Sequence, residues 1–123
     1  MAKRKVLIVD DEADIAESLK EIVKRKGCQA FSALKSEEGW GIFQRERPDI
    51  CCIDIHMPDS DFDGIELLRK IRDMDKDVRC FLLTRVEDKD KRDEAQRLGV
   101  EAYFEKPLSS EEFEKFIDLI AGK

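Results

Sequence analysis

Short apolar runs alternate along the chain with segments in which apolar residues recur every three or four positions. The apolar runs are typical of buried strands, and they lie at 5–9, 28–33, 50–53, 78–83 and 102–105. The segments between and after them have helical spacing, at 12–26, 36–44, 64–74, 88–98 and from Ser109 onward. Because parallel strands need crossovers of this length, five strands alternating with five helices predict an α/β fold with helices on both faces of a parallel sheet.

Local signals place several helix ends. Ser36 is expected to cap the second helix, and Ser109 with Glu112 forms a capping box for the last one. Gly39 and Gly41 are expected to weaken the second helix, by about 1 kcal/mol each relative to alanine.

Composition narrows the class of protein. The 123 residues are expected to form one domain, 1–123, and the net charge of −6 argues against a nucleic-acid-binding surface and favours a divalent cation or a basic protein partner. No run of about 18 apolar residues is present, so no membrane span is expected. The apolar stretch after the basic residues 1–5 is too short for a signal peptide. Four cysteines without metal-ligand spacing favour buried, reduced thiols in a cytoplasmic protein.

Polar residues stand where the predicted strands end. Asp10 and Asp11 follow the first strand, Asp54 ends the third, Thr84 ends the fourth and Lys106 follows the fifth. Ligand sites of open α/β sheets lie beyond the carboxyl ends of the strands. If the strands concerned are neighbours, these side chains converge on one pocket.

The chemistry of such a pocket points to phosphate and a hard cation. Crowded carboxylates raise one another's pKa unless a cation lies among them, and oxygen ligands suit Mg²⁺. An aspartate can accept a phosphoryl group as a nucleophile. Lys106 and Thr84 would supply the charge and the hydrogen-bond donor that a phosphoryl group on Asp54 needs.

Five motifs occur in order: VLIVDDE, CCIDIHMP, DGIELLRKIR, LLT and YFEKP. With them, essentially the whole chain resembles the receiver domain of two-component response regulators, the chemotaxis receiver among them. The resemblance implies a flavodoxin-like, doubly wound, five-stranded sheet of order 2-1-3-4-5. It also implies a phosphorylation switch that uses Mg²⁺ and is not a turnover enzyme. The implied partners are a sensor histidine kinase or histidine phosphotransfer protein, a downstream effector domain or protein, and a second copy on phosphorylation.

The resemblance also implies roles for residues of the acidic group. Asp54 matches the phosphoacceptor. Asp11 matches the residue that binds Mg²⁺ directly, and Asp10 its neighbour, which often acts through water. The backbone carbonyl of His56 matches the third protein ligand.

Another group of residues matches the switch. Thr84 corresponds to the switch hydroxyl, Lys106 to the phosphate-binding lysine and Tyr103 to the aromatic switch residue. Pro107 corresponds to the proline that follows a cis peptide bond in the family. A partner is expected to read a change in the surface 86–105.

The chain departs from the family pattern in three places. The loop after Asp54 is enlarged by two residues, Arg85 stands where a small residue is usual, and Leu108 replaces a frequent phenylalanine. Arg85 and His56 flank the expected phosphoryl site. We expect the bulk and charge of Arg85 to slow hydrolysis, with His56 modulating the lifetime of the phosphorylated state.

Other interpretations of single motifs are weaker. The stretch DSDFDG begins like a calcium-binding EF-hand loop, but its twelfth position is Lys70 rather than glutamate. An Asp-x-Asp phosphatase would need an acid where His56 stands, and the His56 ring lacks companions for a metal site. Tyr103 can also be a plain core residue. The charged run 87–94 is typical of a solvated helix face, and its few apolar residues suggest a loosely held helix.

Two rival functions stay open at this point. A pseudo-receiver would bind partners without being phosphorylated, although such a protein usually lacks part of the acidic and switch set that this chain has. A phosphorelay intermediate would pass its phosphoryl group on and have no output of its own. The sequence does not separate a relay intermediate from a switch.

Overall fold

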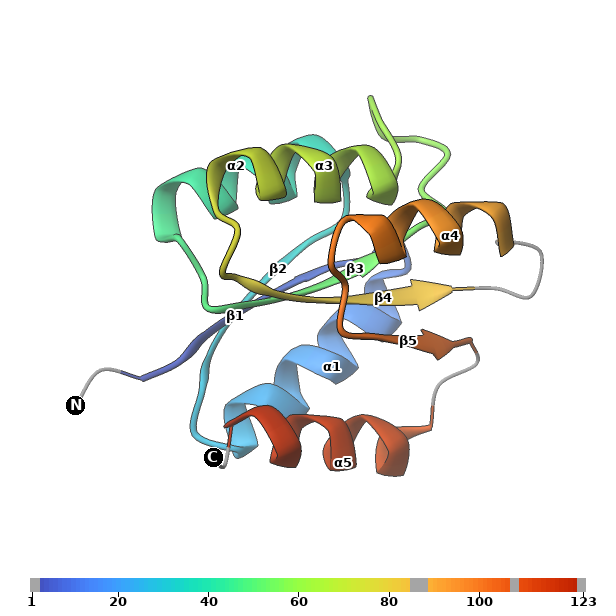
Figure 1. Cartoon of the computed structure of the whole chain (residues 1–123). Helices are drawn as coiled ribbons and strands as arrows, with labels where there is room; N and C mark the ends of the chain where they lie inside the picture. Colours follow the sequence, from blue (N-terminus) through green and yellow to red (C-terminus); the bar gives the residue numbers. More distant parts are fainter. Residues whose placement is uncertain (1–2, 85–88, 107–108, 122–123) are drawn as a thin grey trace.

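A computed structural model describes residues 3–84, 89–106 and 109–121. Strands and helices alternate strictly along this chain (Figure 1). The strands are β1 (Lys5–Val9), β2 (Gln29–Ala33), β3 (Ile50–Asp54), β4 (Arg79–Thr84) and β5 (Ala102–Glu105). The helices are α1 (Ala13–Arg25), α2 (Ser36–Glu46), α3 (Gly64–Met74), α4 (Lys89–Arg97) and α5 (Ser110–Ala121).

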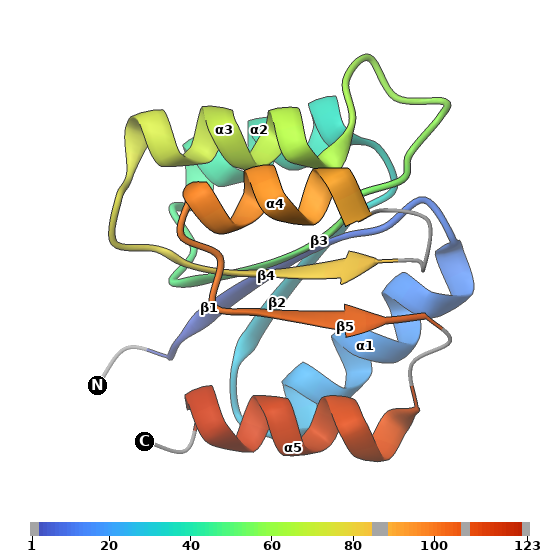
Figure 2. The ribbon, with the colours of Figure 1, turned by 45° about the vertical axis from the view of Figure 1, so that its right-hand side comes forward.

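The strands form one parallel sheet in the order β2-β1-β3-β4-β5. Helices α2, α3 and α4 cover one face, and α1 and α5 cover the other (Figures 1 and 2). The predicted fold class, a flavodoxin-like doubly wound sheet, is therefore confirmed. The order reverses at β1 and β3, so their carboxyl ends lie at the switch point where such folds place ligands.

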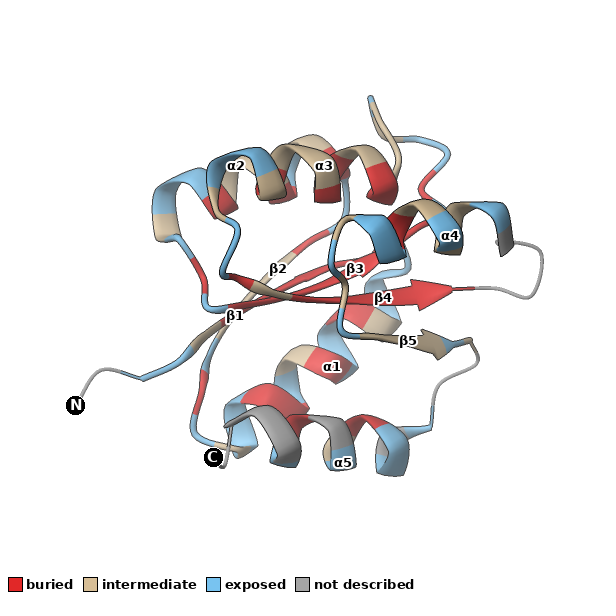
Figure 3. Cartoon of the chain, in the orientation of Figure 1, coloured by how far each residue is buried: buried red, intermediate tan, exposed pale blue. Residues whose placement is uncertain are grey.

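Two apolar layers hold the helices to the sheet. Leu7 and Val9 of β1 pack toward α2 and α3, where they meet Phe43 and Leu68. Ile8, the residue between them, belongs to the layer under α1 and α5. Both faces of the central strands are thus buried (Figure 3), which explains why they read as continuous apolar runs.

The two predicted helix caps have different outcomes. Ser109 caps α5 as predicted, because its hydroxyl accepts the Glu112 N–H at 3.1 Å. The cap predicted at Ser36 is wrong, since Ser36 is already the first residue of α2 and Lys35 precedes it without a side-chain cap. The hydroxyl of Ser60 accepts the Ser36 N–H at 3.0 Å instead. This cap comes from a distant loop, which local sequence rules do not reveal.

Two glycines bring helices close to the strands that carry the site. A Cβ on Gly39 would lie 2.7 Å from Val9 Cγ2, so this glycine allows α2 to pack tightly on β1. A Cβ on Gly64 would overlap the carbonyl oxygen of Asp54. The start of α3 therefore lies directly against the end of β3, and Gly64 makes that approach possible.

The four cysteines are buried free thiols. Three of them lie in strands as expected, whereas Cys28 precedes β2. In the part of the chain that the structure describes, no helix has the length and apolar character needed to cross a membrane.

Candidate functional site

Four of the predicted site residues lie at the carboxyl edge of the sheet. Asp10 follows β1, Asp54 ends β3, Thr84 ends β4 and Lys106 follows β5. The backbone N–H of Lys106 donates to the Thr84 carbonyl at 2.8 Å, which fixes the lysine beside β4. Asp10, Asp54 and Thr84 are fully buried, and the Lys106 side chain is 7% exposed.

The ammonium group of Lys106 joins the carboxylates. Its Nζ lies 2.9 Å from Asp10 Oδ2, 3.1 Å from Asp54 Oδ2 and 2.9 Å from Glu12 Oε1. Backbone N–H groups of Glu12 and His56 donate to the other oxygens of Asp10 and Asp54, at 2.9 and 3.3 Å. The predicted convergence of Asp10, Asp54 and Lys106 is thus present in the folded chain.

Burial sets the protonation of this group. Loss of solvent raises the pKa of Asp54 to about 7; the charge of Asp10 adds to this shift, while Lys106 and the His56 N–H oppose it. Burial also raises the pKa of Asp10, against the Glu12 N–H and Lys106. For Lys106, burial lowers the pKa, but hydrogen bonds with Glu12 and Asp10 and the charge of Asp54 outweigh it, so the net shift is upward.

The same carboxylates are suited to hold a metal ion. Oxygen atoms of Asp10, Asp11, Glu12 and Asp54 all lie within 4.8 Å of one another. Oxygen-only donors at this spacing fit a hard cation such as Mg²⁺. Glu12 was not among the residues predicted from the sequence, although its place directly after Asp10 and Asp11 was a usable signal. The His56 side chain is exposed, and its ring does not belong to this acidic group as far as the structure describes it.

Thr84 and Tyr103 contact α4 rather than the acidic group. The Thr84 hydroxyl accepts a hydrogen bond from Arg92 Nη2 at 3.0 Å. The Tyr103 hydroxyl donates to the backbone carbonyl of Arg92 at 2.8 Å, and the half-buried ring packs against the core. Sequence reasoning also missed Arg92, which lies in a charged run where nothing distinguishes it from its neighbours.

Two residues of the enlarged loop contact neighbouring helices. The backbone N–H of Asp61 donates to Glu37 Oε1 of α2 at 3.0 Å. Asp63 caps α3 by accepting the Glu66 N–H at 2.9 Å, and its second oxygen lies 3.1 Å from Lys91 Nζ. Residues 65–70 are helical, so the calcium-loop alternative finds no support.

Two predicted residues lie outside the described residues. These are Arg85, expected to affect the phosphoryl lifetime, and Pro107, expected to follow a cis bond. Both assignments stay predictions.

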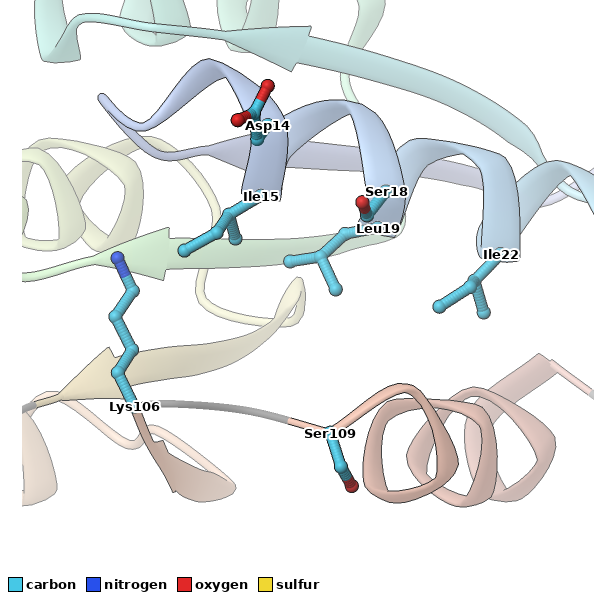
Figure 4. A pocket seen from close by; sticks show the side chains of 7 residues that line it. All are labelled: Asp14, Ile15, Ser18, Leu19, Ile22, Lys106 and Ser109. Carbon is cyan, nitrogen blue, oxygen red and sulfur yellow. The ribbon is translucent and has the colours of Figure 1, made fainter.

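A hollow of about 190 Å³ lies between α1 and α5, next to the acidic group. Figure 4 shows Ile15, Leu19 and Ile22 of α1 turned toward α5, with Lys106 at one end. This hollow is an apolar surface that ends at the lysine bound to Asp54.

Comparison with known proteins identifies the family. A family model for the response regulator receiver domain matches residues 6–118. The chain belongs to the response regulator receiver family. Asp10, Asp54, Thr84 and Lys106 all lie within the matched segment of this receiver.

Individual relatives agree with this assignment. The chain is 33% identical over 112 residues to Sporulation initiation phosphotransferase F of Bacillus subtilis, covering 91% of this chain and 89% of the relative. It is also 36% identical over 115 residues to the probable transcriptional regulator ycf27 of Porphyridium aerugineum. That match covers 93% of this chain but only 46% of the regulator. Among solved structures, the receiver domain of AraT from Geobacillus stearothermophilus superposes with a TM-score of 0.87 at 27% identity, covering 98% of this chain and 95% of AraT's.

Proposed function

We propose that this receiver, residues 1–123, accepts a phosphoryl group on Asp54 from a phosphohistidine of a sensor histidine kinase or histidine phosphotransfer protein. A carboxylate oxygen of Asp54 attacks phosphorus, a P–O bond forms, and the P–N bond to the histidine breaks as the imidazole leaves. The observation that carries this proposal is the bridge from Lys106 to buried Asp54 and Asp10 within a cluster of oxygen donors.

The residues around Asp54 have distinct tasks in this proposal. Asp10, Asp11 and Asp54, with the His56 carbonyl, would hold Mg²⁺, and Glu12 lies close enough to join them. The bound ion would neutralise charge on the phosphoryl oxygens. Lys106 already lies at hydrogen-bond distance from Asp54, so it can pair with a phosphoryl oxygen after a small movement. The nucleophile must be ionised; in the metal-free site the pKa of Asp54 is raised to about 7, and a bound cation would lower it and so favour the reactive carboxylate.

The hollow between α1 and α5 suggests how the donor docks. Its apolar wall, formed by Ile15, Leu19 and Ile22, ends at Lys106 and therefore beside Asp54. A helical histidine-bearing partner that packs an apolar side chain there would bring its phosphohistidine to the acidic group. Asp14 on the rim would favour a basic residue of that partner.

The output of the switch is proposed to pass through Thr84 and Tyr103. A phosphoryl oxygen on Asp54 would attract the Thr84 hydroxyl, and its movement would leave room for Tyr103 to turn inward. The surface 86–105 would then change and be read by an effector or by a second copy of the chain. Water later hydrolyses the acyl phosphate, so the receiver is changed by the reaction rather than turning over a substrate.

A relay role is the second candidate. Sporulation initiation phosphotransferase F is matched along 89% of its length, and its name denotes phosphotransfer. In a relay, Asp54 would pass the phosphoryl group to a histidine of a second protein. Buried free thiols suit a reducing compartment, so we place either role in the cytoplasm.

Incubation with a small phosphodonor and Mg²⁺ tests the proposal. The intact protein should gain one phosphoryl group, and Asp54→Asn or removal of Mg²⁺ with a chelator should abolish the gain. Asp59→Asn, in the exposed part of the same loop, is the matched control and should be phosphorylated like the wild type. An Asp54→Asn protein that is phosphorylated at the wild-type rate would show that Asp54 is not the acceptor.

A further inference from the structure

Arg92 of α4 touches three residues at the ends of β4 and β5. Its Nη2 donates to Thr84 Oγ1 at 3.0 Å and lies 3.5 Å from Glu105 Oε2. Its guanidinium carbon is 5.8 Å from the centre of the Tyr103 ring, and its carbonyl accepts the Tyr103 hydroxyl. One side chain thus connects α4 with both residues proposed to carry the switch.

The strand register shows which way this contact draws Thr84. Asp54 pairs with Leu83, whose side chain belongs to the layer under α1 and α5. Leu82 belongs to the opposite layer, and Thr84 shares its side of β4 because side chains alternate along a strand. The Thr84 hydroxyl therefore extends toward α4, away from the face of the sheet to which Asp54 belongs.

In this contact the Thr84 hydroxyl is the acceptor and Arg92 is the donor. A guanidinium group only donates, so Arg92 holds the Thr84 hydroxyl as an acceptor. The hydroxyl is fully buried, and a charged donor in such surroundings makes a strong hydrogen bond. Arg92 Nε is buried and has no hydrogen-bond partner among the described residues.

We propose that Arg92 is a positioning residue that holds Thr84 against α4 in the resting receiver and must release it when Asp54 is phosphorylated. This inference rests on the proposed function of Asp54 and adds a residue that opposes the switch. The positive charge of Arg92 acts in the other direction, because it attracts a phosphoryl group. The two effects predict opposite results when the side chain is replaced.

Binding of beryllofluoride, a phosphoryl analogue, in excess Mg²⁺ tests the proposal by calorimetry. Arg92→Met keeps the apolar stem of the side chain but removes the guanidinium donor, so the analogue should bind at least about fivefold more tightly, which is the gain expected for loss of a hydrogen bond of ordinary strength. Loss of charge alone would weaken binding. Arg97→Met, on the exposed side of the same helix, is the matched control and should bind like the wild type or slightly less tightly.

A Thr84→Val variant shows whether the effect of Arg92→Met depends on the bond to Thr84. In Thr84→Val the bond is already absent, so adding Arg92→Met should give no gain in affinity, and the lost charge should weaken binding slightly. Equal or weaker binding by Arg92→Met in the wild-type background overturns the proposal. If Arg92→Met does not fold, Arg92→Gln, whose amide is too short to replace the guanidinium, should show the same tightening.

A measurement without ligand separates this inference from the proposed function. A double-mutant cycle of Arg92→Met and Thr84→Val in urea unfolding should show a coupling of at least about twofold in the unfolding equilibrium constant. Additive effects would mean that the resting bond does not exist. Failure of the wild type to bind the analogue would instead count against the phosphoacceptor role of Asp54, whatever the cycle shows.

Discussion

Charged residues are buried in one region of this receiver and exposed to solvent in another. At the carboxyl edge of the sheet, Asp10, Asp54 and Lys106 are almost completely buried, and their charges depend on one another. Along α4, the ion pairs lie at the surface: Lys91 with Asp63 has side chains 42% and 37% exposed. Because the first group is buried, removing the partner of one of its charges should change the free energy of unfolding strongly. Solvent screens the charges of the second group, so each of its ion pairs contributes little to stability.

Helices α3 and α4 show the consequence for packing. α3 buries Ile65, Leu67, Leu68 and Ile71 against the sheet. In the part of α4 whose side chains are described, 90–97, only Ala95 is buried. Besides the Arg92 contacts, two ion pairs connect α4 with its surroundings: Arg69 with Glu94, and Asp63 with Lys91. Just after the end of α4, the Arg72 side chain donates to the carbonyls of Leu98 and Gly99, at 2.7 and 3.0 Å. An element held mainly by exposed polar contacts can move at low cost, which suits the proposed output surface.

Replacing the buried cation should have the largest effect. Lys106→Met leaves Asp10 and Asp54 buried without their ammonium partner, so at pH 8 without divalent ions the free energy of unfolding should fall by about 3 kcal/mol. Added Mg²⁺ should restore part of the loss. Urea unfolding measures both.

Lys91→Met is the surface counterpart and should cost less than about 1 kcal/mol. Equal losses from Lys106→Met and Lys91→Met would remove the difference between the two regions.

Asp54→Asn should stabilise the metal-free protein at pH 8, by about 1–2 kcal/mol. The folded pKa of about 7 lies above the ordinary 3.8, so the folded state binds more protons than the unfolded state between these values. The contribution of Asp54 to the stability of the wild type therefore falls as pH rises from about 4 to 7 and stays level above that.

The gain from Asp54→Asn should accordingly shrink as pH falls through 7 and be absent near pH 4. Urea titrations at several pH values measure it. A gain of the same size at pH 4 and pH 8 would contradict the raised pKa.

Two substitutions of Asp63 separate the contribution of its helix cap to stability from that of its ion pair. Asp63→Ala removes both the cap on Glu66 N–H and the pair with Lys91, so it should cost about 1 kcal/mol. Asp63→Asn keeps the capping oxygen and loses only the charge, so its cost should be less than half of that. If urea unfolding shows that the two variants are equally destabilised, the surface ion pair and not the cap is the contact through which Asp63 stabilises the protein.

Salt should have the smallest effect, confined to α4. Raising the ionic strength from low salt to 1 M should speed amide hydrogen exchange in α4 about threefold, because its exposed ion pairs are screened. Exchange in α3, held by apolar packing, serves as the internal control and should stay nearly constant. Equal acceleration of both helices would show that charge pairs are not what holds α4.

The sequence was informative where the physics is local. Short apolar runs located the strands, and the predicted ends agree with the structure within one or two residues, as for the helix expected at 88–98 and found at Lys89–Arg97. The capping box of Ser109 and Glu112 is local as well and was predicted. Positions at strand ends were enough to bring Asp10, Asp54 and Lys106 together, because a parallel sheet places all its carboxyl ends on one edge.

Other parts of the site depended on contacts between residues distant in sequence. Ser60 caps α2 across 24 positions, and no helix-start rule looks that far. Arg92 lies within a run of charges, and only the packing of α4 beside β4 selects it as the partner of Thr84.

The amino-acid sequence by itself therefore determined the order and kind of the elements and the carboxylates at the edge of the sheet, since these follow from periodicity and from position along strands. It also indicated the family, through the resemblance of its ordered motifs to those of receiver domains. Tertiary structure alone decided how strongly the pKa values of those carboxylates are perturbed. A pKa of about 7 at Asp54 arises from burial among neighbours that three separate strands bring together. The free energy of a charge depends on the medium around it, and that medium exists only after the chain has folded.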